Sequence, residues 1–126
     1  MMSALEKIVN HGKTKSEFDI RGTKIGLRLL SEEEYHFAVS DCAAEVAKFI
    51  GHRNVNTVHG RTLTLDLMIR ELMTQVISRA AFDPESGQLV FGSPKDVREE
   101  ITRPDRNKLI DSYQTLEQQF QAGQKL

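Results

Sequence analysis

Several residue types are scarce in this chain of 126 residues, and each scarcity narrows the classes of protein that fit it. A single cysteine, Cys42, excludes a disulfide within the chain and argues against a secreted, disulfide-stapled scaffold. Tryptophan is absent and aromatic residues make up only 6% of the chain, so stacked aromatic platforms for single-stranded nucleic acid are not expected. We therefore expect a protein of a reducing cytoplasm.

An excess of either charge is also missing. Lysine and arginine total 17 against 18 aspartates and glutamates, whereas nonspecific nucleic-acid binding needs a concentrated positive field. The N-terminus lacks the apolar run of a signal peptide, and no apolar stretch is long enough to span a bilayer. These absences predict a chain that binds neither nucleic acid nor membranes.

What remains is an ordinary globular composition, with 39% apolar and 28% charged residues. A chain of this length can bury a real core, and it is predicted to form a single domain spanning 1–126. Residues 1–16 have few apolar anchors and are expected to be mobile. Residues 121–126 are expected to be a polar tail.

The N-terminal region changes to a period of two between Phe18 and Leu29. Apolar residues alternate with polar residues or glycine on both sides of Gly22-Thr23, which is typical of a β-hairpin. An isolated hairpin is marginally stable in water, so its apolar face should pack on helices or on another chain.

Helical spacing begins at Ser31. Ser31 and Glu34 form a capping-box pattern, and three glutamates occupy the first turn, where they complement the helix dipole. One apolar stripe then runs to Gly51, through Tyr35, Val39, Cys42, Val46 and Phe49/Ile50. We expect a helix that buries this stripe and ends at the glycine.

A second helix should follow a polar loop at 51–61, with Thr62 or Thr64 as its cap. Its apolar arc is wider than one stripe, and comprises Leu65, Met68, Ile69, Leu72, Met73, Val76, Ile77 and Ala80. Such an arc predicts either a central core helix or a core helix with a second face for a partner.

The last third of the chain has clear boundary signals. Residues 83–87 read as a Pro/Gly turn, and Leu89–Phe91 as an extended segment docked on the core. Ser93-Pro94 should open a short helix to about Ile101, and Pro104 a final helix with a narrow apolar stripe. The predicted fold is mainly α, with three longer helices, one short helix and a short N-terminal β-hairpin.

A catalytic or metal site is not indicated. His52 and His59 share a loop, but neither cysteine pairs nor a histidine pair at ligand spacing accompanies them. Cys42 lies on an apolar stripe, where a small core residue is the simplest interpretation. Pro104-Asp105 lacks the downstream acid-x-Lys of a metal-dependent nuclease. We therefore expect no enzyme, no cofactor and no metal.

The segment from Arg79 to Tyr113 resembles the tail assembly chaperones of long-tailed, siphovirus-type bacteriophages. The resemblance covers roughly residues 17 to 120, including the hairpin and the helix that opens at Ser31. It is built from turn, cap and apolar residues: Arg79, Asp83, Pro84, Gly87, Phe91, Ser93, Pro94, Val97, Leu109 and Tyr113.

This resemblance implies a non-catalytic chaperone that binds the tape measure protein and keeps it soluble while tail tube subunits polymerise around it. The chain would be the short form, and a longer form made by ribosomal frameshifting would recruit the tail tube protein. It would act in the host cell cytoplasm as a homo-oligomer and be absent from the mature virion.

Apolar residues outside the core would form the partner surface of such a chaperone. Methionine suits it because its flexible side chain adapts to irregular partners. The expected contacts come from the second helix and from the hairpin: Leu63, Leu67, Met68, Met73, Phe18, Ile20, Ile25 and Leu27. The alternative is that these residues are core and core cover.

Two other functions stay open at this point. A minor structural protein of the virion, of the tail completion or connector type, would be found in purified particles. A small DNA-binding regulator would bind DNA with a steep dependence on salt.

Overall fold

The computed structural model describes residues 3–5, 15–50 and 58–124, apart from the side chains of 49–50, 58–64 and 122–124. The predicted fold class is confirmed: three long helices, a short helix and an N-terminal hairpin, with one additional short strand. In chain order the elements beyond residue 14 are β1 (Lys15–Ile20), β2 (Thr23–Arg28), α2 (Glu32–Ile50), α3 (Val58–Ala80), β3 (Ala81–Phe82), α4 (Pro94–Glu99) and α5 (Arg103–Gln124).

The hairpin turns at Arg21-Gly22, one residue before the predicted Gly22-Thr23. Both residues have positive φ, 52° and 83°, and Ile20 pairs with Thr23 across the turn. This is the two-residue turn whose twist matches that of the flanking strands, and it requires positive φ at both positions. Thr23 is instead the first residue of β2.

The start of α2 confirms the predicted capping box. The Glu34 amide donates to the Ser31 hydroxyl at 3.2 Å, and the Ser31 amide donates to the Glu34 carboxylate at 3.0 Å. Arg28, at the end of β2, donates both guanidinium nitrogens to the same carboxylate. Chiefly through this paired hydrogen bond, the pKa of Glu34 falls from 4.5 to about 2.

A lowered pKa makes Glu34 a source of acid sensitivity. Its ionised form is favoured in the folded state, so the stabilisation is present above pH 4.5 and is lost as pH falls toward about 2. The Glu34→Gln variant should be less stable at pH 7 and should show a flatter loss of stability across that window, measured by urea unfolding. Glu33→Gln is the matched control, and an equal flattening there would contradict the assignment.

The core lies where the second half of α3 meets the inner face of the sheet and α5. Leu27 of β2, Ile77 of α3 and Leu109 of α5 are almost completely buried. Of the predicted stripe of α5, Leu109, Tyr113 and Leu116 are buried, and Phe120 is half-buried. The Tyr113 hydroxyl accepts a hydrogen bond from the Leu30 amide, which ties α5 to the strand–helix junction.

Strand β3 was not predicted, because two residues carry too little pattern to separate them from the end of α3. It pairs antiparallel with β2 and gives the sheet the order β1-β2-β3. The Phe82 ring lies directly over Gly26, where any Cβ would collide with it. Glycine at this position between Ile25 and Leu27 therefore makes room for an aromatic ring.

The turn after β3 forms as predicted. Gly87 has a φ of 76°, and its amide donates to the Asp83 carbonyl at 2.7 Å. The expected docking of Leu89–Phe91 is correct only for Phe91, which is buried, whereas Leu89 and Val90 are 55% and 41% exposed. A segment crossing the surface can turn only some of its side chains inward.

The two helix starts that follow differ in their caps. Ser93 precedes Pro94 as predicted, but its hydroxyl makes no capping bond, and α4 ends at Glu99 rather than Ile101. The Asp96 carboxylate instead accepts from the Gly92 amide at 3.0 Å. Before α5, the Thr102 side chain accepts from the Asp105 amide at 3.3 Å.

Helix α3 starts at Val58, so the expected loop up to residue 61 and the caps at Thr62 or Thr64 are wrong. A helix paired with α2 gains enough from packing to continue through residues that carry no start signal. The rest of that expected loop, 51–57, and most of the expected mobile start lie outside the described residues.

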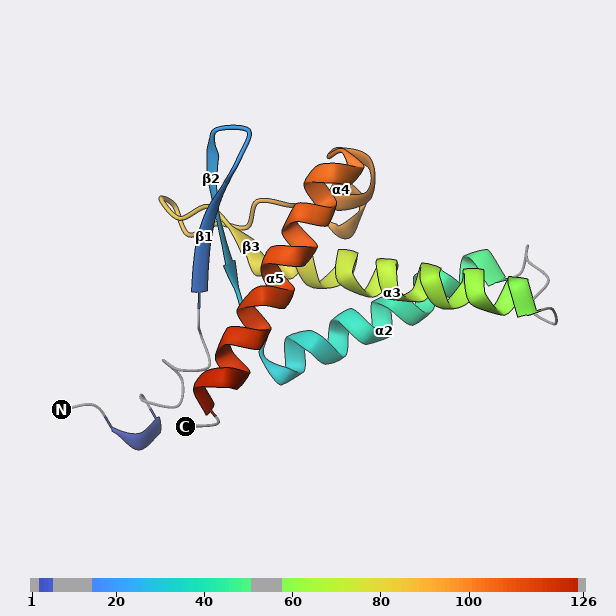
Figure 1. Ribbon diagram of the computed structural model, residues 1–126, viewed down its shortest axis with the longest axis horizontal. Helices are drawn as coiled ribbons and strands as arrows, with labels where there is room; N and C mark the ends of the chain where they lie inside the picture. Colours follow the sequence, from blue (N-terminus) through green and yellow to red (C-terminus); the bar gives the residue numbers. More distant parts are fainter. Residues whose placement is uncertain (1–2, 6–14, 51–57, 125–126) are drawn as a thin grey trace.

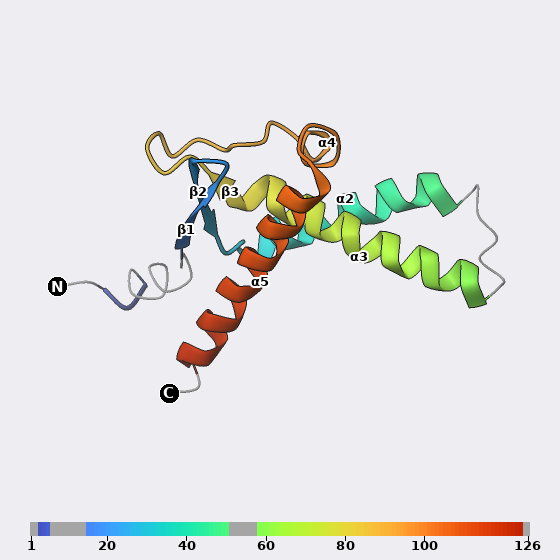
Figure 2. The same ribbon diagram turned by 45° about the horizontal axis from the view of Figure 1, so that its top comes forward.

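Figures 1 and 2 show how these elements are arranged. The sheet, α4, α5 and the second half of α3 gather at one end. The first half of α3 and most of α2 extend from this body as an antiparallel helical pair, which we call the arm. Among the described elements, α3 is the one against which α2 packs extensively.

Candidate partner-binding groove

The arm has a charged flank and an uncharged flank, and the spacing of residues along α2 causes the difference. Asp41, Glu45 and Lys48 recur at intervals of three or four, so they share one side of the helix. Val39, Ala43 and Ala47 follow the same spacing on the other side. The two flanks therefore offer different chemistry to their surroundings.

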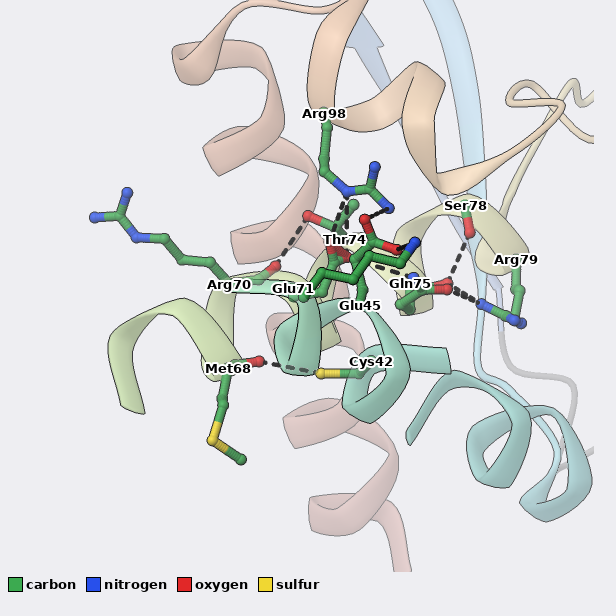
Figure 3. Close-up of polar contacts among 11 residues, drawn as sticks. Cys42, Glu45, Met68, Arg70, Glu71, Thr74, Gln75, Ser78, Arg79 and Arg98 are labelled. Carbon is green, nitrogen blue, oxygen red and sulfur yellow. Dashed lines mark hydrogen bonds and ion pairs between the residues drawn. The ribbon is translucent and has the colours of Figure 1, made fainter. Parts of the chain in front are cut away.

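The charged flank joins the arm to the body through α3 (Figure 3). Arg79 of α3 forms an ion pair with Asp41 of α2 and also donates to the Gln75 side chain at 2.8 Å. Arg98 reaches from α4 to the Glu71 carboxylate at 2.6 Å and approaches Glu45 at 4.0 Å. These bonds connect α2, α3 and α4 on one side of the arm.

Glu71 is the most buried charged residue of this cluster, at 6% exposure. Its carboxylate accepts from Arg98 and, at 3.4 Å, from the Gln75 side-chain amide. Among the described residues, every buried polar side-chain atom has a hydrogen-bond partner. The buried polar atoms of the charged flank are thus satisfied by contacts within the chain.

The opposite flank contains an open apolar groove of about 400 Å³ between α2 and α3. Four large side chains along it are about half exposed: Val39 at 43%, Leu65 at 58%, Met68 at 43% and Ile69 at 54%. The lining residues are all apolar: Val39, Cys42, Ala43, Val46, Ala47, Leu65, Met68, Ile69 and Leu72. An apolar surface of this kind is typical of a site for a protein partner.

Cys42 forms part of the groove floor, on the side toward α3. Its thiol donates to the Met68 carbonyl at 3.4 Å, and burial, with a smaller effect of Glu71, raises the pKa of the thiol (Figure 3). A raised pKa lowers the thiolate fraction at neutral pH and therefore the reactivity of the sulfur. The groove is suited to apolar contact rather than to nucleophilic chemistry.

The structure separates the predicted contacts on α3. Met68 lines the groove, and Leu67 is half-buried outside it. Met73 is partly buried against the main core, and the Leu63 side chain lies outside the described residues. Of these four, Met68 is the residue that the structure places in the groove.

The predicted contacts on the hairpin face the protein's own core. Ile20, Ile25 and Leu27 have 8%, 7% and 0% exposure, and Phe18 is half-buried against the same cluster. These residues cover α3 and α5, as the alternative interpretation stated. We therefore exclude them from the candidate surface.

Sequence reasoning placed Val39 on a stripe directed at the core, and it left open whether the arc that contains Leu65 and Ile69 also had a face for a partner. It did not name these three residues among the expected partner contacts. Tyr35, from the same predicted stripe, is also 45% exposed, while Ala38 is fully buried in its stead. One signal was available: from Val39 onward, the groove side of α2 carries small or apolar residues and no charge. A solvated helix face would normally carry charges there.

In the described part of the chain, no three histidine, cysteine or acidic side chains lie close enough together to hold a metal ion. None of the described helices is long and apolar enough to cross a membrane.

Comparisons with protein-family models, curated proteins and solved structures yield no match to this chain.

Proposed function

We propose that the protein is a non-catalytic tail assembly chaperone of a long-tailed bacteriophage, which holds the tape measure protein in the host cytoplasm. The exposed apolar groove between α2 and α3 is the observation that supports this function. A tape measure is a long helical protein whose apolar stripe would aggregate if left uncovered. The groove offers an apolar surface of matching character.

The shape of the groove suits a helix. Its α2 side runs from Val39 to Ala47, a rise of about 12 Å or slightly more than two helical turns. An amphipathic partner helix could place apolar residues from successive turns along that length. Met68 at the rim can adapt its rotamers to a partner whose sequence varies along its length.

A short, open groove also implies weak binding by each copy. The groove is little more than two helical turns long, so one copy would bury only part of the stripe of a long partner. Several copies along one filament would gain avidity without strong individual contacts. Weak single contacts suit a holdase, because the growing tail tube must displace it.

The test is co-expression of the chaperone with the tape measure protein encoded in the same phage genome. The wild type should keep the tape measure protein soluble and co-purify with it. The Leu65→Asp/Ile69→Asp variant should lower the recovered complex at least about tenfold, because burying an unpaired carboxylate costs more than the apolar contact provided. Capture would be measured by affinity pull-down and by the soluble fraction.

The matched control is Leu89→Asp/Val90→Asp, at residues that are 55% and 41% exposed but lie outside the arm. It adds the same two carboxylates at exposed positions and should leave capture unchanged. Far-UV circular dichroism would verify that all variants fold. Normal capture by the groove variant would contradict the surface, and recovery of the chain in purified virions would contradict the function.

A further inference from the structure

We propose that the free edge of β1 pairs with β1 of a second copy, antiparallel about a two-fold axis at Ser16. This inference goes beyond the proposed function and does not depend on it, because the dimer would form without a tape measure protein. In the described part of the chain, β1 is an outer strand whose one strand partner is β2. Outer strands offer unpaired backbone groups to another chain.

The hairpin geometry fixes which residues offer those groups. In a two-residue hairpin, the pair that flanks the turn exchanges both backbone hydrogen bonds, and such pairs alternate along the strands. Here the flanking pair is Ile20 and Thr23. It follows that Ile20, Phe18 and Ser16 direct their backbone groups to β2, whereas Asp19, Glu17 and Lys15 direct theirs to the open side.

One of the outward groups is already occupied. The Lys108 ammonium of α5 donates to the Asp19 carbonyl at 2.7 Å. This contact confirms that Asp19 faces away from β2, and it closes the edge at the turn end. The stretch available for pairing is therefore Lys15 to Glu17.

The charges along β1 then select the register. With the axis at Ser16, each Lys15 lies opposite Glu17 of the other copy, which gives two pairs of opposite charge. An axis at Glu17 would place two glutamates opposite each other, and an axis at Phe18 would place Glu17 opposite Asp19. Of these three positions, Ser16 is the one at which an axis avoids like charges. In that register the Asp19 carbonyl also keeps its hydrogen bond from the Lys108 ammonium.

Both charged side chains can reach a second copy. Glu17 is 49% exposed in a loose pair with Lys24 at 3.6 Å, and Lys15 lies over the Phe82 ring at 5.6 Å from its centroid. Both contacts are long and exposed, so each charged group can leave its present partner for a closer one on a second copy. Alternating opposite charges make this edge complementary to itself, which favours a second copy over an unrelated strand.

In the described part of the chain, a hollow of about 240 Å³ lies between β1 and α5, and its lining includes Ser16, Phe18, Thr115 and Leu116. An added strand would lie over this hollow and place its inward side chains against α5. The free edge and the hollow are separate features, and a β1 strand of a second copy would cover both.

The first test is a disulfide at the axis. In the proposed register the two Ser16 residues form a non-hydrogen-bonded pair with Cα atoms about 4.5 Å apart, within the range that a disulfide needs. Ser16→Cys should therefore form a covalent dimer under mild oxidation. Lys24→Cys, an exposed position on β2, is the matched control and should cross-link at least about tenfold more slowly, since the geometry offers it no facing partner.

The second test exchanges the charges. Lys15→Glu and Glu17→Lys should each weaken dimerisation at least about tenfold, because each places like charges opposite one another. The double variant should restore it. Sedimentation would be followed up to about 1 mM, because so short an interface is weak. Thermal melts followed by circular dichroism would confirm that each variant folds.

Three results would overturn the pairing: a chain that stays monomeric over that range, single charge variants that associate like the wild type, or equal cross-linking at positions 16 and 24. Cross-linking of Ser16→Cys only to a different protein would also overturn it, because the edge would then belong to a foreign strand. Loss of tape measure capture with the dimer intact would affect only the proposed function.

Discussion

The Arg98→Met variant is expected to lose about 3 kcal/mol of unfolding free energy, because it leaves the buried Glu71 carboxylate without its counter-charge. Arg98 is 27% exposed at its side chain, whereas Glu71 is 6% exposed, so water can replace the guanidinium only in part. Methionine keeps the length of the arginine stem and its packing. The loss would therefore report the charge rather than a cavity.

Removing the charges of both Arg98 and Glu71 should lower the unfolding free energy much less than removing that of Arg98 alone. Arg98→Met combined with Glu71→Leu eliminates the desolvation penalty together with the ion pair, and such replacements are often close to neutral. Urea unfolding at pH 7, followed by far-UV circular dichroism, measures both variants. If the single variant stayed within about 0.5 kcal/mol of the wild type, the range of an ordinary surface substitution, the pair would not hold α4 on the arm.

Features that depend on neighbouring residues could be predicted from the sequence. The capping box at Ser31 and Glu34, the turn around Gly87 and the proline start of α4 each need only a few adjacent residues. Their hydrogen bonds close within the same short segment, so distant parts of the chain cannot change them much. The hairpin turn lies one position earlier in the chain than predicted. The sequence left this open because Gly22 can occupy either the first or the second position of a two-residue turn.

Features that depend on distant packing could not be predicted. The apolar arc of α3 has one helical period from Leu65 to Ala80, and that period does not reveal where the body of the protein ends. Only the second half of the helix meets the sheet and α5. Leu65 and Ile69, nearer the start of the helix, continue the same pattern but lie beside α2 in the groove, and within the described part of the chain they stay exposed.

The same limit applies to the candidate sites. The groove arises because α2 and α3 leave the body together, and the buried hairpin residues result from how the sheet lies on α5. Alternation on β1 predicted which side chains point inward. It could not show that Lys108 closes one end of the edge, since that contact joins residues 89 positions apart.

Two alanine substitutions on α3 are expected to differ strongly in the unfolding free energy that they remove, although each replaces an isoleucine. Ile77→Ala should cost about 4 kcal/mol, because it removes a fully buried side chain and leaves a cavity between α3, the sheet and α5. Ile69→Ala, at a residue that is 54% exposed, should cost no more than about 0.5 kcal/mol. Urea unfolding measures both, and Ile77→Val, at about 1 kcal/mol, serves if Ile77→Ala proves too unstable.

This comparison decides whether the arm groove is available to a partner. A side chain that is already half in water loses little when it is truncated, so a small cost for Ile69→Ala means that the groove stays open in solution. If the two costs were similar, another part of the chain or a second copy would already cover Ile69. In that case a tape measure helix would have to displace that cover before it could bind. The groove would then no longer support the proposed function as a holdase.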